Sequence, residues 1–460
     1  MIYKTTKNAL SPFLLCFFGI FILTPFNAEA QEKISLQRAI ELALQNNLQI
    51  KQAQLNEALS SETLSQSRYA IYPSFNGSTN TNYSIGRSFD QLSGQLVEKG
   101  ITSLNTGVNS SVTLFQGYQK INQIAQNKFE LEADKSNTAR IKNDLMLAVV
   151  TTYLQILSGQ DLVEAAKQQV TLATQQLDRE QKFFDVGEKT IADLSQSKAQ
   201  LAAAELNLTD AQNQSDLAFL NLAQLLELDP AAPIDVVRPV TDDPGKIAQY
   251  TASEVFKSSL NNYPEVKFAE FRRLASEKGV EIAKGNHYPR LTLGGNLGTG
   301  YSTSRQQYVQ GTNPPVFERI NFADQLNENI NRSIGLSLSF PIFNGYQARS
   351  SVRRAKIGLQ NAEISVQLAK NNLNKIVNQS VYDLRAAEKR YNSAQSAFES
   401  SRTAFSAIEQ RYGVGLVNSL DFNQAQTNLN RAQFDLIQAK YDVIFRSKVI
   451  DFYLGNPLTF

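Results

Sequence analysis

The side chains that most often perform catalysis are nearly missing from this chain, which has 460 residues, one His, one Cys, two Met and no Trp. A single His and a single Cys do not suffice for a His/Cys zinc site, a disulfide or a Cys–His dyad within one chain. His287 directly precedes Tyr288-Pro289, and no triad motif accompanies it. We therefore predict that the protein is not an enzyme and has no catalytic residue, no cofactor and no metal site.

A cluster of glycines is the next candidate for chemistry. Gly294-Gly295, Gly298 and Gly300 lie close enough together to suggest a phosphate-binding loop. Such a loop opens a helix and supplies a Lys, whereas these glycines lie in a stretch with the alternation of a strand. The 45 Lys and Arg residues are balanced by 43 Asp and Glu residues, so there is no basic footprint for nucleic acid. We expect neither a phosphate loop nor a nucleic-acid partner.

Two carboxylates remain, Asp193 and Asp421, and each follows a break in a long helical pattern. The breaks are Val186-Gly187 and Val414-Gly415, where glycine permits the turn and a following Thr or Asn is placed to cap the returning helix. Each Asp then lies in a first helical turn, where the helix dipole favours a carboxylate. For either Asp alone, this structural role explains the residue as well as a functional role does.

Long helices must position these turns. From Ala348 to Tyr412 apolar residues recur at alternating spacings of three and four, with one slip and no proline. Sixty-four residues of helix extend about 96 Å at 1.5 Å per residue. Residues 119–183 repeat the pattern, and a shorter helix is expected to return each time, over 190–226 and 418–454. Heptads of this length require partner helices, as in a coiled coil.

The chain is internally duplicated. Tyr72-Pro73 recurs as Tyr288-Pro289 at an offset of 216 residues, and Leu114–Tyr118 recurs as Ile342–Tyr346 at an offset of 228. The difference indicates a twelve-residue insertion in the second copy, which we place in the loop at 302–331. We predict a first repeat at 31–229, a linker at 230–250, a second repeat at 251–455 and a C-terminal tail at 456–460.

Each repeat contains two stretches in which apolar residues alternate with Gly, Asn, Ser or Thr. The predicted strands are about 74–86, 104–115, 290–301 and 332–343. A half-buried sheet of a soluble domain is one interpretation. The strand length and the nearly uncharged polar face favour a transmembrane barrel instead. Four strands cannot close a barrel, and an open sheet edge is not tolerated in lipid, so this interpretation requires several copies of the chain.

The first thirty residues have the pattern of a secretory signal peptide. Lys4 and Lys7 precede an apolar stretch at 13–23, and Ala28-Glu29-Ala30 is a small-x-small cleavage site. The apolar stretch is too short for a membrane-spanning helix, and it contains the only cysteine, Cys16. We expect residues 1–30 to be removed on export. We find no later run of eighteen apolar residues and expect no transmembrane helix.

These motifs together resemble those of the TolC-type outer-membrane efflux factor family over essentially the whole mature length. The shared features are the duplication, the Tyr-Pro pairs, the Phe-x-Gly-Tyr exits and the turn patterns at 184–193 and 411–421. The resemblance implies a mainly α fold with a β-barrel part. In that fold a duplicated strand-helix protomer, with four strands, two very long helices and shorter ones, forms a trimeric twelve-stranded β-barrel and a coiled-coil α-barrel.

The same resemblance implies a function. The chain would be the outer-membrane exit duct of a tripartite efflux or type I secretion system in a Gram-negative-type cell. It would be a homotrimer, embedded in outer-membrane lipid, that reaches through the periplasm to a periplasmic adaptor protein and an inner-membrane pump. Such ducts passively conduct drugs, metals, siderophores or proteins. The alternatives are a structural or adhesive coiled-coil surface protein, and an enzyme with an unrecognised Asp/Glu site.

The resemblance also assigns roles at the turns. By motif position Tyr412, Asp193 and Asp421 correspond to residues of a gate, where three chains would bring six carboxylates together. Val417 stands where an Arg of the family can hold the tip closed, and our hypothesis is that Lys189, its match in the first repeat, supplies the missing cation. The residues implied to form the hairpin tips and to dock the adaptor are Val186, Gly187, Val414, Gly415 and Leu416.

Overall fold

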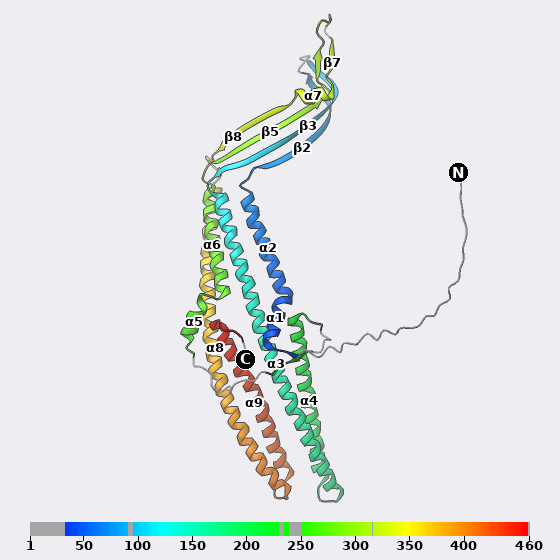
Figure 1. Ribbon diagram of the computed structural model, residues 1–460, viewed down its shortest axis with the longest axis vertical. Coiled ribbons are helices and arrows are strands. Elements are labelled where there is room, and N and C mark those ends of the chain that lie inside the picture. Colours follow the sequence, from blue (N-terminus) through cyan, green and yellow to red (C-terminus); the bar gives the residue numbers. More distant parts are fainter. Residues whose placement is uncertain (1–32, 91–94, 230–233, 239–249, 315, 459–460) are drawn as a thin grey trace, which may run out of the picture.

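The computed structural model describes residues 33–90, 95–229, 234–238, 250–314 and 316–458. The predicted signal peptide and most of the predicted linker at 230–250 lie outside these residues. The described chain is an elongated protomer with a sheet at one end and long helices that run to the other end (Figure 1). The prediction of a mainly helical protomer with four long strands and two very long helices is confirmed.

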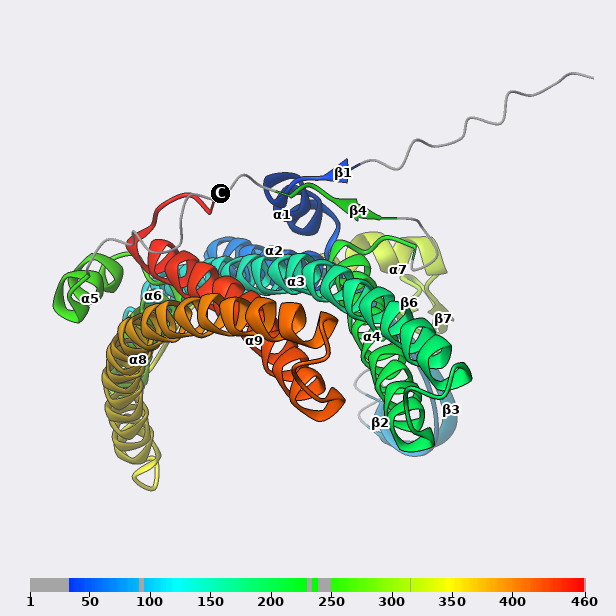
Figure 2. The ribbon, with the colours of Figure 1, turned by 90° about the horizontal axis from the view of Figure 1, so that it is seen from below.

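Two antiparallel helical hairpins form the long part of the molecule. The first joins α3 (Gln119–Asp185) to α4 (Ile191–Leu226), and the second joins α8 (Gln347–Gly413) to α9 (Ser419–Leu454). The two long helices have 67 residues each, which corresponds to about 100 Å, and the two returning helices have 36 each. Viewed along their length, the four helices follow an arc rather than a closed bundle (Figure 2).

Shorter helices lie beside the halves of the long helices that are nearest the sheet. Helix α2 (Leu48–Tyr69) packs on α3, and α6 (Pro264–Gly285) packs between α3 and α8. At mid-length α1 (Leu36–Asn46) and α5 (Ala252–Leu260) lie against the long helices (Figure 1). Two-residue strands β1 (Lys33–Ile34) and β4 (Asp235–Val236) pair in parallel there.

The core is richest at this level, where α1, α3 and α4 meet. Leu145, Val149, Tyr153 and Leu157 of α3 are buried in one hydrophobic cluster. The hydroxyl of Tyr153 donates to the backbone oxygen of Val237 at 2.6 Å, and burial raises its pKa to about 12. Of the helices in the described part of the chain, only α3 is long and apolar enough to cross a membrane, against our expectation of none. Half of that stretch is buried, which is typical of a core helix.

The main sheet has the order β2-β3-β5-β8, and all its neighbours are antiparallel. Strands β2 (Ser74–Asp90) and β3 (Gln95–Gln116) are longer than predicted, and β5 covers Arg290–Ser302. Strand β8 (Asn331–Ser339) ends earlier than predicted, because Pro341 lacks the amide hydrogen that a ladder requires. Strands β2 and β8 are the two edges of this sheet.

The two faces of the sheet differ as the alternation predicts. One face carries Gly, Asn, Ser and Thr, and the other carries large apolar side chains that stay exposed in the protomer. Ile334 of β8 is 86% exposed. Leu336 and Leu338 of the same strand are also exposed, and so is Phe75 of β2 at the other edge. An exposed apolar band of this kind needs a nonaqueous environment or a partner.

The Phe-x-Gly-Tyr motif makes the turn from strand to helix. Gly117 and Tyr118 both have positive φ, at 56° and 59°, and a Cβ on Gly117 would lie 2.5 Å from the carbonyl oxygen of Gly285. Phe115 packs edge-on against Tyr118, with ring centroids 5.5 Å apart. The second copy repeats this geometry with Phe343 and Tyr346 at 5.6 Å. The motif therefore encodes a left-handed elbow, and any other residue in place of its glycine would strain the backbone.

The predicted loop at 302–331 contains regular structure. A small hairpin of β6 (Gln306–Tyr308) and β7 (Phe317–Arg319) projects from the end of the sheet, and α7 (Phe322–Glu328) follows it (Figure 1). Gln325 of α7 is buried and binds both backbone groups of Ser302. The insertion is thus fixed to the end of β5.

Gly159 permits the close approach of α3 and α4, which gives a test of the packing. A Cβ at this position would lie 3.3 Å from both Cα and Cβ of Ser215. We expect Gly159→Leu to lower the thermal midpoint followed by circular dichroism, because overpacking costs about 1–3 kcal/mol. Gly358→Leu is the control, since a Cβ at Gly358 meets no atom within 4 Å. Equal midpoints for the two variants would contradict the close approach.

Candidate functional site at the hairpin tips

Each hairpin turns through a short loop in which glycine adopts a left-handed conformation. Gly187 has a φ of 80° and Gly415 a φ of 75°. The amide of Glu188 donates to the oxygen of Phe183 at 2.8 Å, and the second loop closes in the same way. The side chains at the ends of the loops are apolar and exposed. They are Val186 at 69%, Val414 at 71% and Leu416 at 69%.

The returning helices are capped as predicted, by Thr190 and Asn418. The hydroxyl of Thr190 accepts from the amide of Asp193 at 3.2 Å, and the Asp193 carboxylate accepts from the amide of Thr190 at 3.2 Å. This reciprocal pair is a capping box. Asn418 accepts from the amide of Asp421 at 2.8 Å, whereas the Asp421 side chain is exposed in the protomer.

Asp193 also joins the two hairpins. The hydroxyl of Ser419, at the start of α9, donates to Asp193 Oδ1 at 2.6 Å. This bond, followed by the bonds from Thr190, lowers the pKa of the Asp193 carboxyl below its usual range. The carboxylate form is therefore favoured, and the contact is lost only as the pH falls through the lowered pKa.

Tyr412 makes a second and more buried contact between the hairpins. Its hydroxyl donates to Oε1 of Glu180 on α3, and Gln176 Nε2 donates to both the Tyr412 hydroxyl, at 3.1 Å, and Glu180 Oε1, at 2.8 Å. Glu180 is 1% exposed. Burial, then the hydrogen bond to Glu180 and the negative charge of Glu180, raise the pKa of Tyr412, so the tyrosine stays protonated as a donor.

Lys189 belongs to the same cluster. Its ammonium nitrogen lies 3.9 Å from Glu180 Oε2 and 5.1 Å from the centre of the Tyr412 ring. Glu180 Oε2 is buried and has no hydrogen-bond donor among the described residues, so the ion pair is the interaction that compensates its charge. We call Tyr412, Glu180, Gln176 and Lys189 the tip cluster.

Aromatic packing holds the Tyr412 ring in place. Phe422 of α9 stacks on it with centroids 4.6 Å apart and an interplanar angle of 22°, and Phe405 of α8 packs against Phe422 at 5.5 Å. The guanidinium of Arg179, on α3, lies 5.3 Å from the centre of the Tyr412 ring. The tyrosine is therefore oriented by its own hairpin and bonded to the other one.

Comparison with known proteins identifies the fold of which these tips are part. Residues 39–227 and 255–456 match the family described as outer membrane efflux protein. This chain belongs to that family. The Brucella suis outer membrane efflux protein BepC is 21% identical over 408 residues, which cover 88% of this chain and 82% of the relative. Escherichia coli outer membrane protein TolC is 23% identical over 418 residues, with coverage of 88% and 79%.

Solved structures share the fold of this outer membrane efflux protein. The outer membrane protein VceC of Vibrio cholerae superposes with a TM-score of 0.76 at 17% identity, covering 92% of this chain and 97% of that one. The Campylobacter jejuni CmeC outer membrane channel gives a TM-score of 0.75 at 18% identity, with coverage of 91% and 85%. The expected fold and outer-membrane location are confirmed, and the efflux interpretation replaces the structural or adhesive one.

The structure of this efflux protein brings some predicted tip residues together and adds others. Tyr412 and Lys189 meet in the tip cluster, and Asp193 lies at the neighbouring contact with Ser419. Sequence reasoning missed Glu180, Gln176 and Ser419. Glu180 had a signal, because it lies on the heptad seam of α3 at the position that corresponds to the apolar Ile408 of the second repeat.

The hydroxyl of Tyr412 gives a test of the tip cluster. Tyr412→Phe keeps the stacking on Phe422 but leaves the buried Glu180 without its hydroxyl donor, which costs about 1–3 kcal/mol. We expect faster hydrogen exchange in residues 176–190 and 405–416, measured by mass spectrometry. Tyr382→Phe is the matched control on the same helix, where the tyrosine is exposed. Unchanged exchange in Tyr412→Phe would show that the bond does not hold the tips.

Proposed function

We propose that this chain is the exit duct of a tripartite efflux or type I secretion system. In this role it passively conducts substrates from an inner-membrane pump across the periplasm and the outer membrane. The observation that carries the proposal is the joining of two parts in one protomer. A sheet with an exposed apolar face continues directly into helices about 100 Å long, whose far ends expose further apolar side chains.

Assembly as a homotrimer is supported by what the protomer leaves unpartnered. Strands β2 and β8 are edges, and three copies of the four-stranded sheet would supply the twelve strands of a closed barrel. Exposed apolar residues also follow α2 and α8 with the same spacing of seven and then four residues. They are Leu48, Leu55 and Leu59 on α2, and Ile357, Ile364 and Leu368 on α8. Neighbouring copies would cover both stripes.

The tips are the proposed docking surface for a periplasmic adaptor protein. Val186, Val414 and Leu416 expose apolar surface at the end of the molecule, and Gly187 and Gly415 shape the loops beneath them. Relatives differ in cargo by name, from a pyoverdine export protein of Pseudomonas putida to an alkaline protease secretion protein of Pseudomonas aeruginosa. We therefore propose the duct and its docking surface, but assign no one class of cargo to this chain.

Gating would act through the contacts between the hairpins. Separation of the second hairpin from the first requires that Tyr412 leaves Glu180 and that Ser419 leaves Asp193. In the trimer Asp193 and Asp421 of three chains would face one axis. Two such charges about 6 Å apart repel by about 3 kcal/mol at an effective dielectric of 20. Bound cations would therefore favour the closed arrangement.

Assembly can be tested by extraction of the protein from outer membranes with detergent, followed by measurement of its mass. We expect three protomers in each particle, because four strands leave two unpaired edges in lipid. A monomeric particle would contradict the barrel and with it the duct.

Lys189→Ala tests the gate. The substitution removes the positive charge beside the buried Glu180 carboxylate, so we expect higher conductance of the resting channel in planar lipid bilayers. Lys198→Ala, at the next lysine along the chain and on α4, is the control. If Lys189→Ala leaves the resting conductance at the wild-type value, Lys189 does not hold the gate.

Asp421→Asn tests the carboxylate ring. Fewer negative charges at the constriction bind divalent cations more weakly, so we expect less block of the current by a divalent cation. Glu188→Gln removes a carboxylate from the turn of the first hairpin, outside the predicted constriction, and serves as the control. Block of equal strength in wild type and Asp421→Asn would remove Asp421 from the constriction.

A further inference from the structure

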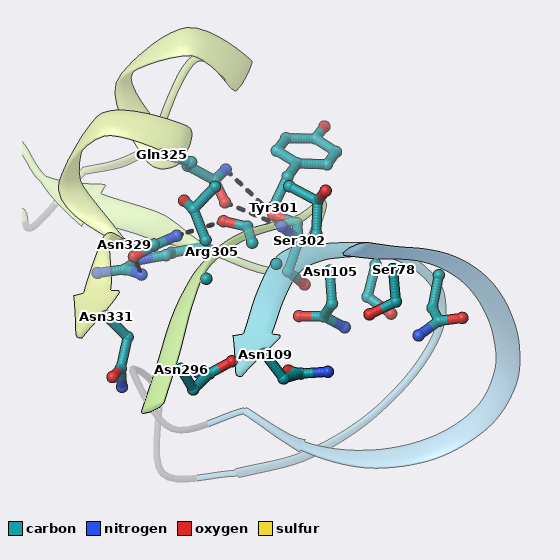
Figure 3. Close-up of a pocket in the computed structure, with 17 residues that line it drawn as sticks. Ser78, Asn105, Asn109, Asn296, Tyr301, Ser302, Arg305, Gln325, Asn329 and Asn331 are labelled. Atoms are coloured by element: carbon teal, nitrogen blue, oxygen red, sulfur yellow. Dashed lines mark hydrogen bonds between the residues drawn. The ribbon is translucent and has the colours of Figure 1, made fainter. Parts of the chain in front are cut away.

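The polar face of the main sheet carries a hollow that the proposed function leaves without a role. It has a volume of about 510 Å³ and lies where the loop at 302–331, which holds the insertion, meets the strands. Asparagines from adjacent strands project into it, with Asn105 and Asn109 from β3, Asn296 from β5 and Asn331 from β8 (Figure 3). Ser78 and Ser103 also line the hollow from β2 and β3.

Two of the glycines that resembled a phosphate loop, Gly298 and Gly300, line the floor of this hollow. Gly298 pairs with Gly107 in the register of β3 and β5, and Gly300 pairs with Asn105. A Cβ on Gly300 would lie 2.7 Å from Oδ1 of Asn105, and a Cβ on Gly298 would lie 3.3 Å from the oxygen of Thr106. Larger residues here would displace the asparagine or fill the space, so the glycines keep the hollow open.

The insertion provides a fixed outer wall. Gln325 accepts from the amide of Ser302 at 2.9 Å and donates to the oxygen of Ser302 at 3.1 Å (Figure 3). Asn329 donates to the oxygen of Gly300 at 2.6 Å, and Arg305 donates to Asn329. Two amides of the wall are thus engaged by the backbone of the strand. Within the described part of the chain, the amides of Asn105, Asn109, Asn296 and Asn331 have no such hydrogen bond.

The chemistry of the lining selects a class of ligand. The residues that line the hollow include no Asp or Glu, and Arg305 is their one charged member. Cations therefore find no carboxylate, and a multiply charged anion finds a single guanidinium that is already bonded to Asn329. Each asparagine amide offers both donors and an acceptor, which matches the hydroxyl group of a sugar, itself a donor and an acceptor.

We propose that this hollow is a low-affinity subsite for neutral polyhydroxylated molecules, such as the sugar units of an oligosaccharide. The proposal goes beyond the proposed duct and rests on it for one point, the position of the hollow inside the barrel lumen. Low affinity follows from the lining. Tyr301 is the one aromatic residue in the lining, and its ring packs on Phe322 with centroids 5.0 Å apart. Binding therefore relies on hydrogen bonds, and each of these only replaces a hydrogen bond to water. Weak binding also suits a conduit, from which a solute must be able to leave.

Saturation-transfer NMR with maltohexaose tests the proposal on the full chain, purified in a detergent without a sugar headgroup. Transfer from the protein to the oligosaccharide is expected, with a dissociation constant in the millimolar range. Polyethylene glycol of similar size is the control solute, because its ether oxygens accept but do not donate hydrogen bonds. Equal transfer to both solutes, or none to maltohexaose, would overturn the subsite.

Substitutions locate the binding. The double variant Asn105→Leu/Asn296→Leu preserves side-chain size without hydrogen bonds, and we expect affinity for maltohexaose about tenfold weaker, equivalent to about 1.4 kcal/mol. Thr292→Val is the control, because Thr292 lies on the same strand and face, four residues from Asn296, and does not line the hollow. Affinity that is unchanged in the double variant, or equally weakened in the control, would place any binding elsewhere.

The mass of the same particle separates this proposal from the proposed function. A trimer that does not bind maltohexaose contradicts the subsite and leaves the duct standing. A monomer that binds it through Asn105 and Asn296 contradicts the duct and leaves the hollow as a sugar subsite outside any lumen.

Discussion

The need to pair backbone polar groups in a membrane is the constraint on which the rest of this structure depends. Each unpaired amide or carbonyl in hydrocarbon costs several kcal/mol, and the four-stranded sheet has two open edges. The protomer is therefore an incomplete object in the outer membrane. Its helices form an open arc (Figure 2), and the apolar stripes of α2 and α8 stay exposed in the part of the chain that the structure describes.

Duplication supplies the symmetry of the protomer, and divergence between the copies supplies the chemistry of its tips. The elbows at Tyr118 and Tyr346 have nearly identical backbone angles, so strand and helix join in the same way in both halves. At the tips the copies differ, because Glu180 corresponds to Ile408 and Tyr412 corresponds to Phe184. One hairpin has thereby become the acceptor and the other the donor of a bond that joins them.

Much of the fold could be predicted from the sequence because periodicity reports burial directly. Helices α3 and α8 are found within a few residues of their predicted bounds, and the β5 strand is found in the same way. The start of β3 was missed because Glu98 and Lys99 interrupt the alternation of apolar and small residues on which the prediction relied. The regular structure of the insertion was missed because its short β6 and β7 have no periodic signal.

The tip cluster was harder to predict because the bonds of Tyr412 join residues far apart in the chain. Tyr412 and Lys189 were recognised from motif position, but the partner that they share, Glu180, is separated from Tyr412 by 232 residues. The position of Glu180 on a seam could have marked it as a buried charge in need of partners. Which hairpin would provide them depends on the packing of α3 against α9, and no local pattern encodes that packing.

The unbroken length of α3 and α8 has a mechanical consequence. Each runs from an elbow at the sheet to the tip without a proline, so it acts as a lever about 100 Å long. A tilt of one degree at the elbow moves the far end by about 1.7 Å, which is enough to part a hydrogen bond. A force applied at the tip therefore has its greatest leverage about the elbow, while the sheet end of the same helix is barely displaced. In the proposed gate, a partner that touches only the last few residues would then drive opening without strain at the membrane end of the helix.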